Sequence, residues 1–490
     1  MSLPSDIYCN PLSIPDYAPG VESFFRGNTD SDGFSGDVCD YRELADPELI
    51  YDGGKWYMFC SGSSAYVTED LVNWEYNPID TNGHIEFQYA PTIAKANGQF
   101  ILTASRQNML WSAPTPLGPY KALGPVQETD GRELSPEYLD PSLFTDDDGR
   151  LYLYWGCSPW GGGIYGVELD ASNPTRTIGE KRKLLEFDPS HAFERFGEYG
   201  EVGNMSWMEG AAMFKHDGIY YLQYATNGTV FRHYAIGVAR SLSPLGPFQM
   251  QHKPACISPE GMVTGTGHGG WVRGKGEDVW QFYTCLCRRL HWFERRVGMD
   301  RVVFEPNGEV HVDVTSTPQS VSKGALGLVP VSVRKAVRAS SFEGGCFPAF
   351  AIDECPHTWW SPKADDAAPW IEINLRHSFD IEALQICWAE TNLDYGKGIT
   401  PEPVKFKAEF FDKDRNPVGK PLDCMDNTHE LLIDFRAVAP VATNTRFVRI
   451  SFSQPASPLR HGITEITAFA KPISSLAEIT ETAANASKQA

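Results

Sequence analysis

The stretch ADPELIYDGGKWYMF, residues 45–59, reads as two short strands joined by a turn, yet it opens with an aspartate. The turn is built on Gly53 and Gly54, and strand-forming residues lie on both sides of it, as in a β-hairpin. An apolar residue would be the ordinary start of such a strand. The charge of Asp46 therefore needs a reason that lies outside the hairpin.

The same pattern recurs four more times in the first 300 or so residues. Two copies are close: LDPSLFTDDDGRLYLYW from Leu139 and MEGAAMFKHDGIYYLQY from Met208. Each has an acid, an apolar strand, a turn with glycine and a second strand that contains tyrosine. Two weaker copies are YAPTIAKANGQFILTA from Tyr89 and GHGGWVRGKGEDVWQFYT from Gly267. The distance between copies is long enough for one four-stranded blade each.

The repeats predict an all-β protein that begins with a five-bladed β-propeller over about residues 1–320. In a propeller the first strand of each blade lines the central channel, so the starts of all repeats point to the same axis. The residues at these starts are Asp46, Ala90, Asp140, Glu209 and His268. Four of the five are ionisable, and we expect a functional site where they converge.

Three carboxylates that face one pocket cannot share one pKa, because each ionised group disfavours ionisation of the others. Inverting glycoside hydrolysis needs such a separation: a carboxylic acid protonates the leaving oxygen while a carboxylate on the opposite face activates water. A third carboxylate can orient the acid. The alternative, an acid that is merely solvated before a turn, fits the DDDG run at 146–149. Asp46, Asp140 and Glu209 instead lie at strand starts.

Five motifs carry a family resemblance: ADPELIYDGGKWYMF, VTEDLVNWE, YLDPSLFTDDDGRLYLYWG, EGAAMFKHDGIYYLQYA and GTGHGGWV. In this order, across about residues 40–310, they resemble glycoside hydrolase family 43. The resemblance implies Asp46 as general base, Asp140 as the acid that tunes the pKa and orientation of its neighbour, and Glu209 as general acid. It also implies that His268 reaches a calcium or sodium ion in the channel, although the chemistry itself requires no cofactor.

The resemblance also implies an arginine of the last blade near the sugar. The run FERRVGMDRVVFEPNGEV offers Arg295, with Arg296 as the alternative. A guanidinium suits hydroxyl groups because it presents a planar fork of donors. Phe25, Tyr89 and Trp111 are candidates for an aromatic platform against the sugar, and ordinary packing is the alternative for each. Many family members have tryptophan at the position of Tyr89, so the resemblance does not predict which sugar is bound.

Beyond the propeller the repeat is lost. Alternating apolar strands such as WIEINL, VKFKAEFF and RFVRISF predict a separate β-sandwich over about 331–470, followed by a tail at 471–490. The runs VRASSFEGGCFPAFAIDECPHTWWSP and PWIEINLRHSFDIEALQICWAE resemble the discoidin, or factor V/VIII type C, galactose-binding-like fold. That resemblance implies a structural calcium in the turn 351–360. Relatives either bind glycans or brace a catalytic partner, and the aromatic candidates are Trp359, Trp360 and Trp388.

The chain has 42 Lys and Arg against 63 Asp and Glu, a formal charge of −21, and no basic run. Nucleic acid is therefore not an expected partner. No apolar stretch approaches the length of about 18–20 residues that a membrane helix needs. The start MSLPSDIYCN lacks the pattern of a signal peptide. Removal of such a segment would favour an extracellular or periplasmic location, and otherwise the cytoplasm is expected; the oligomeric state stays open.

We expect an inverting exo-glycosidase that removes terminal pentose residues from plant cell-wall oligosaccharides, as a β-xylosidase, an α-L-arabinofuranosidase or both. The choice of pentose rests on the resemblance alone. An endo-arabinanase and a galactofuranosidase of the same fold are alternatives. A non-catalytic propeller that binds sugar is the alternative from another class, and the presence of all three carboxylates argues against it.

Overall fold

The computed structural model describes residues 3–15, 41–61, 64–81, 89–105, 109–134, 139–156, 162–287 and 293–472. These residues form two compact units: one takes the described residues of Asn10–Ser316 and Leu393–Gly398, and the other takes those of Met1–Cys9, Thr317–Asn392 and Ile399–Ala490. Helical structure in the described ranges is limited to three short 3-10 turns, η1 (Ala192–Glu194), η2 (Pro348–Ile352) and η3 (Tyr395–Lys397). No helix in these ranges has the length and apolar character needed to cross a membrane.

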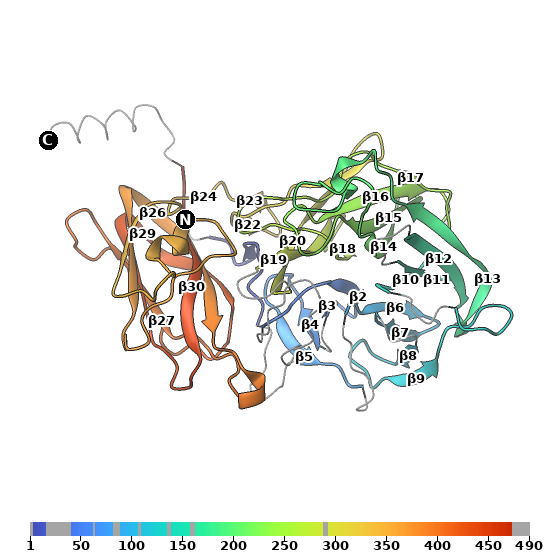
Figure 1. Cartoon of the computed structure of the whole chain (residues 1–490), viewed down its shortest axis with the longest axis horizontal. Coiled ribbons are helices and arrows are strands. Elements are labelled where there is room, and N and C mark those ends of the chain that lie inside the picture. Colours follow the sequence, from blue (N-terminus) through green and yellow to red (C-terminus); the bar gives the residue numbers. More distant parts are fainter. Residues whose placement is uncertain are drawn as a thin grey trace. The chain divides into compact units, whose positions relative to one another are not determined.

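The first unit contains five antiparallel sheets of four strands, each following chain order (Figure 1). Blade one is β2 (Glu48–Asp52), β3 (Lys55–Cys60), β4 (Ser64–Thr68) and β5 (Glu75–Pro78); blade two is β6 (Thr92–Ala96), β7 (Gln99–Thr103), β8 (Leu110–Ala113) and β9 (Lys121–Gly124). Blade three is β10 (Ser142–Thr145), β11 (Leu151–Trp155), β12 (Gly163–Asp170) and β13 (Asn173–Glu186); blade four is β14 (Glu209–His216), β15 (Ile219–Thr226), β16 (Ala235–Ser241) and β17 (Gln249–Met250). Blade five is β18 (Trp271–Arg273), β19 (Val279–Leu286), β20 (Arg295–Phe304) and β21 (Val310–Val312).

The first strands of the five sheets form a closed ring. Each of these strands contacts the first strand of the next blade: β2 contacts β6, β6 contacts β10, β10 contacts β14, and β14 contacts β18. The contact between β18 and β2 then joins the last sheet to the first. This arrangement is the five-bladed β-propeller that the repeats predict, and each quoted repeat supplies the first two strands of its blade.

The chain enters each inner strand through a residue with positive φ. These residues are Asp46 (54°), Ala90 (44°), Asp140 (48°), Gly210 (57°) and His268 (33°). A side chain in this region costs of order 1–3 kcal/mol and persists only where the surroundings fix it. In blade four the position belongs to Gly210, so Glu209 lies one residue earlier than the alignment of the repeats placed it. A register shift between Glu209 and Ala212 in the β14–β15 pair accommodates the difference.

Three of these entry residues are tied to the preceding blade by a hydroxyl group. A serine or threonine near the end of the second strand accepts a hydrogen bond from the N–H of the residue that opens the next blade. The pairs are Ser61 Oγ with Ala90 N (3.1 Å), Ser105 Oγ with Asp140 N (2.6 Å) and Thr284 Oγ1 with Asp46 N (3.0 Å). The strained backbone is therefore held from the side, and the last pair connects blade five to blade one.

The second unit is built on a seven-stranded sheet around one apolar core (Figure 1). Its path is β24 (Val329–Pro330), β30 (Arg460–Ala470), β26 (Trp370–Thr391), β29 (Ile433–Phe452), β27 (Phe406–Phe411) and β28 (Leu422–Cys424), with β25 (Ala336–Ala339) on β26. A smaller sheet joins β1 (Ile7–Tyr8), β22 (Gln319–Ser320) and β23 (Gly324–Ala325). The pairing of β26 with β29 shifts register between Asn374 and Ala383, so each long strand contributes two separate paired segments.

Two of the tryptophans of the second unit belong to its core. Trp360 is 0% exposed and Trp388 is 1% exposed, and both rings pack against Phe452. A platform for a sugar needs an open ring face, so these two side chains are packing residues. Trp359 is half-buried and keeps its place as a candidate. The galactose-binding-like fold of this unit stays a prediction.

Candidate active site

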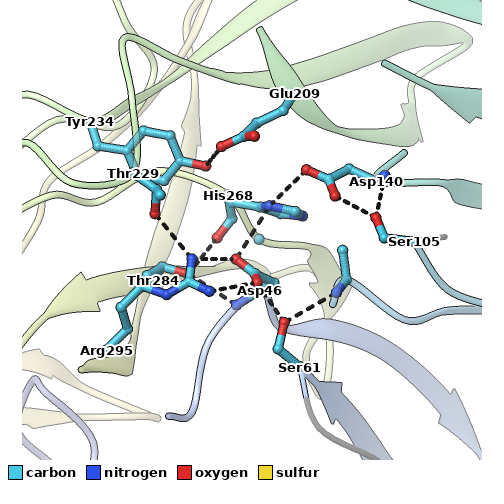
Figure 2. Close-up of polar contacts among 12 residues, drawn as sticks. Asp46, Ser61, Ser105, Asp140, Glu209, Thr229, Tyr234, His268, Thr284 and Arg295 are labelled. Atoms are coloured by element: carbon cyan, nitrogen blue, oxygen red, sulfur yellow. Dashed lines mark hydrogen bonds and ion pairs between the residues drawn. The ribbon is translucent and has the colours of Figure 1, made fainter. Parts of the chain in front are cut away.

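The structure brings together Asp46, Asp140, Glu209 and His268, the four ionisable residues at the starts of the inner strands (Figure 2). Nδ1 of His268 lies 3.3 Å from Oδ1 of Asp46 and 3.8 Å from Oδ2 of Asp140. One carboxylate oxygen each of Asp140 and Glu209 and one ring nitrogen of His268 lie within 4.8 Å of one another. Residues from four blades thus meet at one place, because each inner strand begins there.

Asp46 is buried and held at both oxygens. Arg295 donates from one terminal nitrogen to Oδ1 and from the other to Oδ2, each at 3.0 Å, and Ser61 Oγ donates to Oδ2 at 2.5 Å. Burial favours the neutral acid, but Arg295, His268 and the Ser61 hydrogen bond together outweigh it and hold the pKa of Asp46 below its usual value. The carboxylate is therefore ionised and fixed in orientation, as a general base must be.

Asp140 has a different electrostatic environment. Ser105 Oγ donates to Oδ1 at 2.6 Å and accepts from the main-chain N–H of the same aspartate at 2.6 Å. Burial raises the pKa of Asp140, the charge of Asp46 raises it further, and His268 and the Ser105 hydrogen bond oppose the shift only in part. The pKa values of the two aspartates therefore shift in opposite directions, which lets them take different roles.

Glu209 is oriented by a buried phenol. Tyr234 donates its hydroxyl to Oε1 of Glu209 at 2.6 Å. Two glycines make room for this arrangement. A Cβ at Gly267 would lie 2.2 Å from the Tyr234 ring, and a Cβ at Gly210 would lie 2.7 Å from the His268 ring. Any larger residue at either position would displace a ring that contacts the carboxylates.

Arg295 is buried, and all five of its N–H groups have acceptors in the protein. Beyond the two hydrogen bonds to Asp46, Nε donates to Glu43 Oε1 at 2.7 Å, one terminal nitrogen also donates to Glu43, and the other donates to Thr229 Oγ1 at 3.0 Å. Arg296 instead donates to main-chain carbonyl groups. Arg295 is thus the arginine that reaches the site, where it faces Asp46. A direct contact with sugar stays a prediction.

The three aromatic candidates have different surroundings. Tyr89 is partly exposed, and its ring lies 6.2 Å from that of Phe293, which in turn lies 5.2 Å from the Arg295 guanidinium. Tyr89 is therefore close to the site. Trp111 is 4% exposed and belongs to the apolar core that blades one and two share, so the structure leaves no open ring face there. Phe25 lies outside the described residues.

Five residues that hydrogen-bond to Asp46, Asp140, Glu209 or Arg295 were not anticipated from the sequence: Glu43, Ser61, Ser105, Tyr234 and Thr284. The two serines had a signal, because each follows the second strand of its repeat, in FCS and in TAS. Glu43 and Tyr234 had none, since no repeat position marks them. Their importance follows from the side chains that the fold places beside them.

The family resemblance implies a calcium or sodium ion near His268. The cluster of Asp140, Glu209 and His268 is the one group of three such donors within the described ranges. Carboxylate oxygens suit calcium, and an imidazole nitrogen is a less usual ligand for it. The residues present therefore fit a cation, but two of its ligands would be Asp140 and Glu209, the carboxylates that are also expected to take part in the reaction. The ion stays a prediction, and no step proposed below depends on it.

The turn 351–360 contains carboxylates that fit the predicted structural calcium in part. Asp353 accepts hydrogen bonds from Thr358 Oγ1 and from the N–H of Cys355. Glu465 accepts from the N–H of Glu354 through Oε2, and its buried Oε1 has no hydrogen-bond partner in the described part of the chain. Burial raises the pKa of Glu465 well above its usual value. A cation here would also need main-chain carbonyl oxygens as ligands.

Replacing Tyr234 by phenylalanine tests the orientation of Glu209. We expect kcat to fall by about tenfold on substrates with a sugar leaving group, and by less with nitrophenol, because a hydrogen bond to an ionisable partner is worth about 1.5–3 kcal/mol. Tyr224→Phe is the matched control, since Tyr224 also donates from a buried phenol to a carboxylate, that of Glu194, at 2.7 Å. Equal losses in both variants, with no dependence on the leaving group, would mean that Tyr234 only packs.

Comparison with known proteins identifies the family. The family model described as "Glycosyl hydrolases family 43" matches residues 41–310, more than half of the chain. A xylosidase/arabinosidase of Butyrivibrio fibrisolvens is 32% identical over 223 residues, 40% of this chain and 39% of that protein. A beta-D-galactofuranosidase of Aspergillus niger is 29% identical over 196 residues, 40% of this chain and 51% of that protein.

The chain thus spans about half or less of the length of these relatives. Among solved structures, a thermostable family-43 glycoside hydrolase is 22% identical with a TM-score of 0.49, and the match covers 64% of this chain and 98% of that one. The family match covers the five blades from β2 through β20, stops at the first residue of β21, and includes all four ionisable residues of the site. The chain belongs to family 43 of the glycosyl hydrolases.

Proposed function

We propose that this protein is an inverting exo-glycosidase that removes terminal pentose residues from plant cell-wall oligosaccharides, as a β-xylosidase, an α-L-arabinofuranosidase or both. One observation carries the proposal: three carboxylates meet in separately tuned surroundings. Asp46 has a lowered pKa and two fixed oxygens, Asp140 has a raised pKa, and Glu209 is oriented by a phenol. A site that only bound sugar would have no need to separate them.

The proposed steps follow from these contacts. Asp46 accepts a proton from water as that water attacks the anomeric carbon on the face opposite the leaving group. Glu209 gives its proton to the leaving oxygen in the same step, through the carboxyl oxygen that Tyr234 does not hold. We assign Asp140 the task of orienting Glu209 and tuning its acidity, as the family resemblance implies. The product sugar then has inverted configuration at the anomeric carbon.

The substrate class rests on the relatives. A protein named xylosidase/arabinosidase supports a pentose, and one named beta-D-galactofuranosidase keeps a furanose hexose as an alternative. The other alternative is an endo-arabinanase, which would cleave bonds within the polysaccharide chain rather than at its end. The expected partner is in each case an oligosaccharide or polysaccharide.

A panel of nitrophenyl glycosides tests this proposal. We expect turnover of β-D-xylopyranoside, α-L-arabinofuranoside or both, with the inverted anomer appearing first in proton NMR spectra of the reaction. Turnover of β-D-galactofuranoside alone would replace the pentose with a hexose. Cleavage of linear arabinan without turnover of any aryl glycoside would indicate the endo-acting alternative, and sugar binding without any cleavage would indicate the non-catalytic propeller. A first product with retained configuration would contradict the inverting mechanism.

A further inference from the structure

Glu43 lies next to Arg295, in the segment that leads to β2. Its side chain is 0% exposed, and Oε1 accepts hydrogen bonds from two nitrogens of Arg295. Oε2 is also buried and has no hydrogen-bond partner among the described residues. A buried carboxylate with one oxygen unpaired is costly for stability. Stability alone therefore does not account for a glutamate at this position.

Arg295 is shared between two carboxylates. It donates two N–H groups to Asp46, two to Glu43 and one to Thr229. A guanidinium paired with Asp46 alone would stabilise the ionised aspartate strongly and so make it a weak base. A second anion on the same guanidinium offsets part of that stabilisation, because the positive charge then interacts with both carboxylates.

We infer that Glu43 is a positioning residue for Asp46: it holds Arg295 in one plane against both aspartate oxygens and takes up part of the guanidinium charge, so that Asp46 stays fixed yet basic enough to deprotonate water. The inference rests on the proposed function, in which Asp46 is the general base. It also gives Arg295 a role in the structure that differs from the sugar contact expected from the sequence.

The charge of Glu43 depends on pH in a range that can be measured. Burial raises the pKa of Glu43 to about 7, and the charge of Asp46 raises it as well, while Arg295 and Arg296 oppose the shift. Glu43 is therefore ionised above neutral pH and becomes protonated as the pH falls through that value. Its effect on Asp46 should be present at alkaline pH and absent at acidic pH.

Glu43→Gln separates charge from shape. Glutamine keeps an acceptor oxygen for Arg295, places its amide where Oε2 has no partner, and removes the charge. We expect the ratio of native to variant kcat to be near one at about pH 5.5 and to reach about three- to tenfold at about pH 8.5, as a weakening of the base by up to one pKa unit predicts. KM should not change, since Glu43 does not face the substrate.

Glu43→Ala provides the structural comparison, because it leaves the N–H groups of Arg295 without an acceptor. We expect this variant to lose kcat at every pH and to have a lower Tm. A Gln variant with a ratio that does not change with pH would overturn the inference, as would a rise in KM at unchanged kcat. The conclusion does not depend on the Ala variant, since the Gln variant alone provides the pH ratio.

The test distinguishes this inference from the proposed function. The ratio is measured on whichever aryl glycoside the native protein hydrolyses fastest. If that glycoside carries a sugar other than a pentose, the proposed pentose specificity is wrong, and the same ratio still tests the role of Glu43. Full activity of Asp46→Asn would instead remove the proposed base itself. In that case a pH-dependent ratio in Glu43→Gln would have to be explained through another residue.

Discussion

Replacing Asp46 by asparagine is expected to lower kcat by about 10³- to 10⁴-fold on every substrate, whatever the leaving group. Asparagine cannot accept the proton of the attacking water. Its amide would also face the N–H groups of Arg295, which donate to both oxygens in the native protein. The backbone should be preserved, because asparagine tolerates the positive φ of 54° at this position better than most residues do.

Asp146→Asn is the matched control for this substitution. Asp146 is also a buried aspartate, so the solvated position expected for it from the sequence is wrong. Lys215 holds it at 2.7 Å and Tyr220 at 2.5 Å, and it lies at the other end of β10 from Asp140. We expect this variant to lose stability and to keep its kcat. Circular dichroism and steady-state kinetics on both variants check the result. More than a tenth of native activity in folded Asp46→Asn would rule out the base role.

Replacing Glu209 by glutamine is expected to have an effect that depends on the leaving group. On an oligosaccharide, kcat should fall by about 10³-fold, because the departing sugar oxygen needs a proton. On a dinitrophenyl glycoside the loss should stay within about tenfold, since that leaving group departs as a stable anion. The measurement is kcat on a series of aryl glycosides plotted against the pKa of the leaving phenol. The plot should be steeper for the variant than for the native protein.

Asp46→Asn provides the contrast, since loss of the base should lower the rate equally along the same series. If both variants gave parallel plots, Glu209 would not be the general acid. If Asp140→Asn gave the steep plot in its place, the roles of the two acids would have to be exchanged.

The propeller could be predicted from the sequence because each blade begins with the same hairpin, and a hairpin is a local feature of the chain. The convergence of Asp46, Asp140, Glu209 and His268 followed from the symmetry of the fold. The exact offset in blade four did not, because the positive φ that aligns the blades falls on Gly210. Glycine adopts this conformation without any sign in the pattern of acids.

Apart from Arg295 and the two serines, the surroundings of the carboxylates could not be predicted from the sequence. Glu43 and Arg295 are 252 positions apart, and nothing in either segment marks them as partners. The aromatic residues also show what the sequence cannot reveal. Trp111 and Trp388 are of the residue type that forms sugar platforms, but each packs in a core. Whether a ring faces solvent or a neighbouring strand depends on tertiary packing, and residue type does not reveal it.

The way the ring closes has a consequence for how activity is lost. Asp46 belongs to blade one, yet its main-chain N–H is held by Thr284 and its carboxylate by Arg295, and both partners belong to blade five. The proposed base is thus assembled across the seam where the two ends of the propeller meet. If that seam parts under heat or denaturant while the other interfaces persist, inactivation will precede the loss of β-structure. Loss of the proposed turnover would then be a more sensitive measure of ring opening than any spectrum of the whole fold.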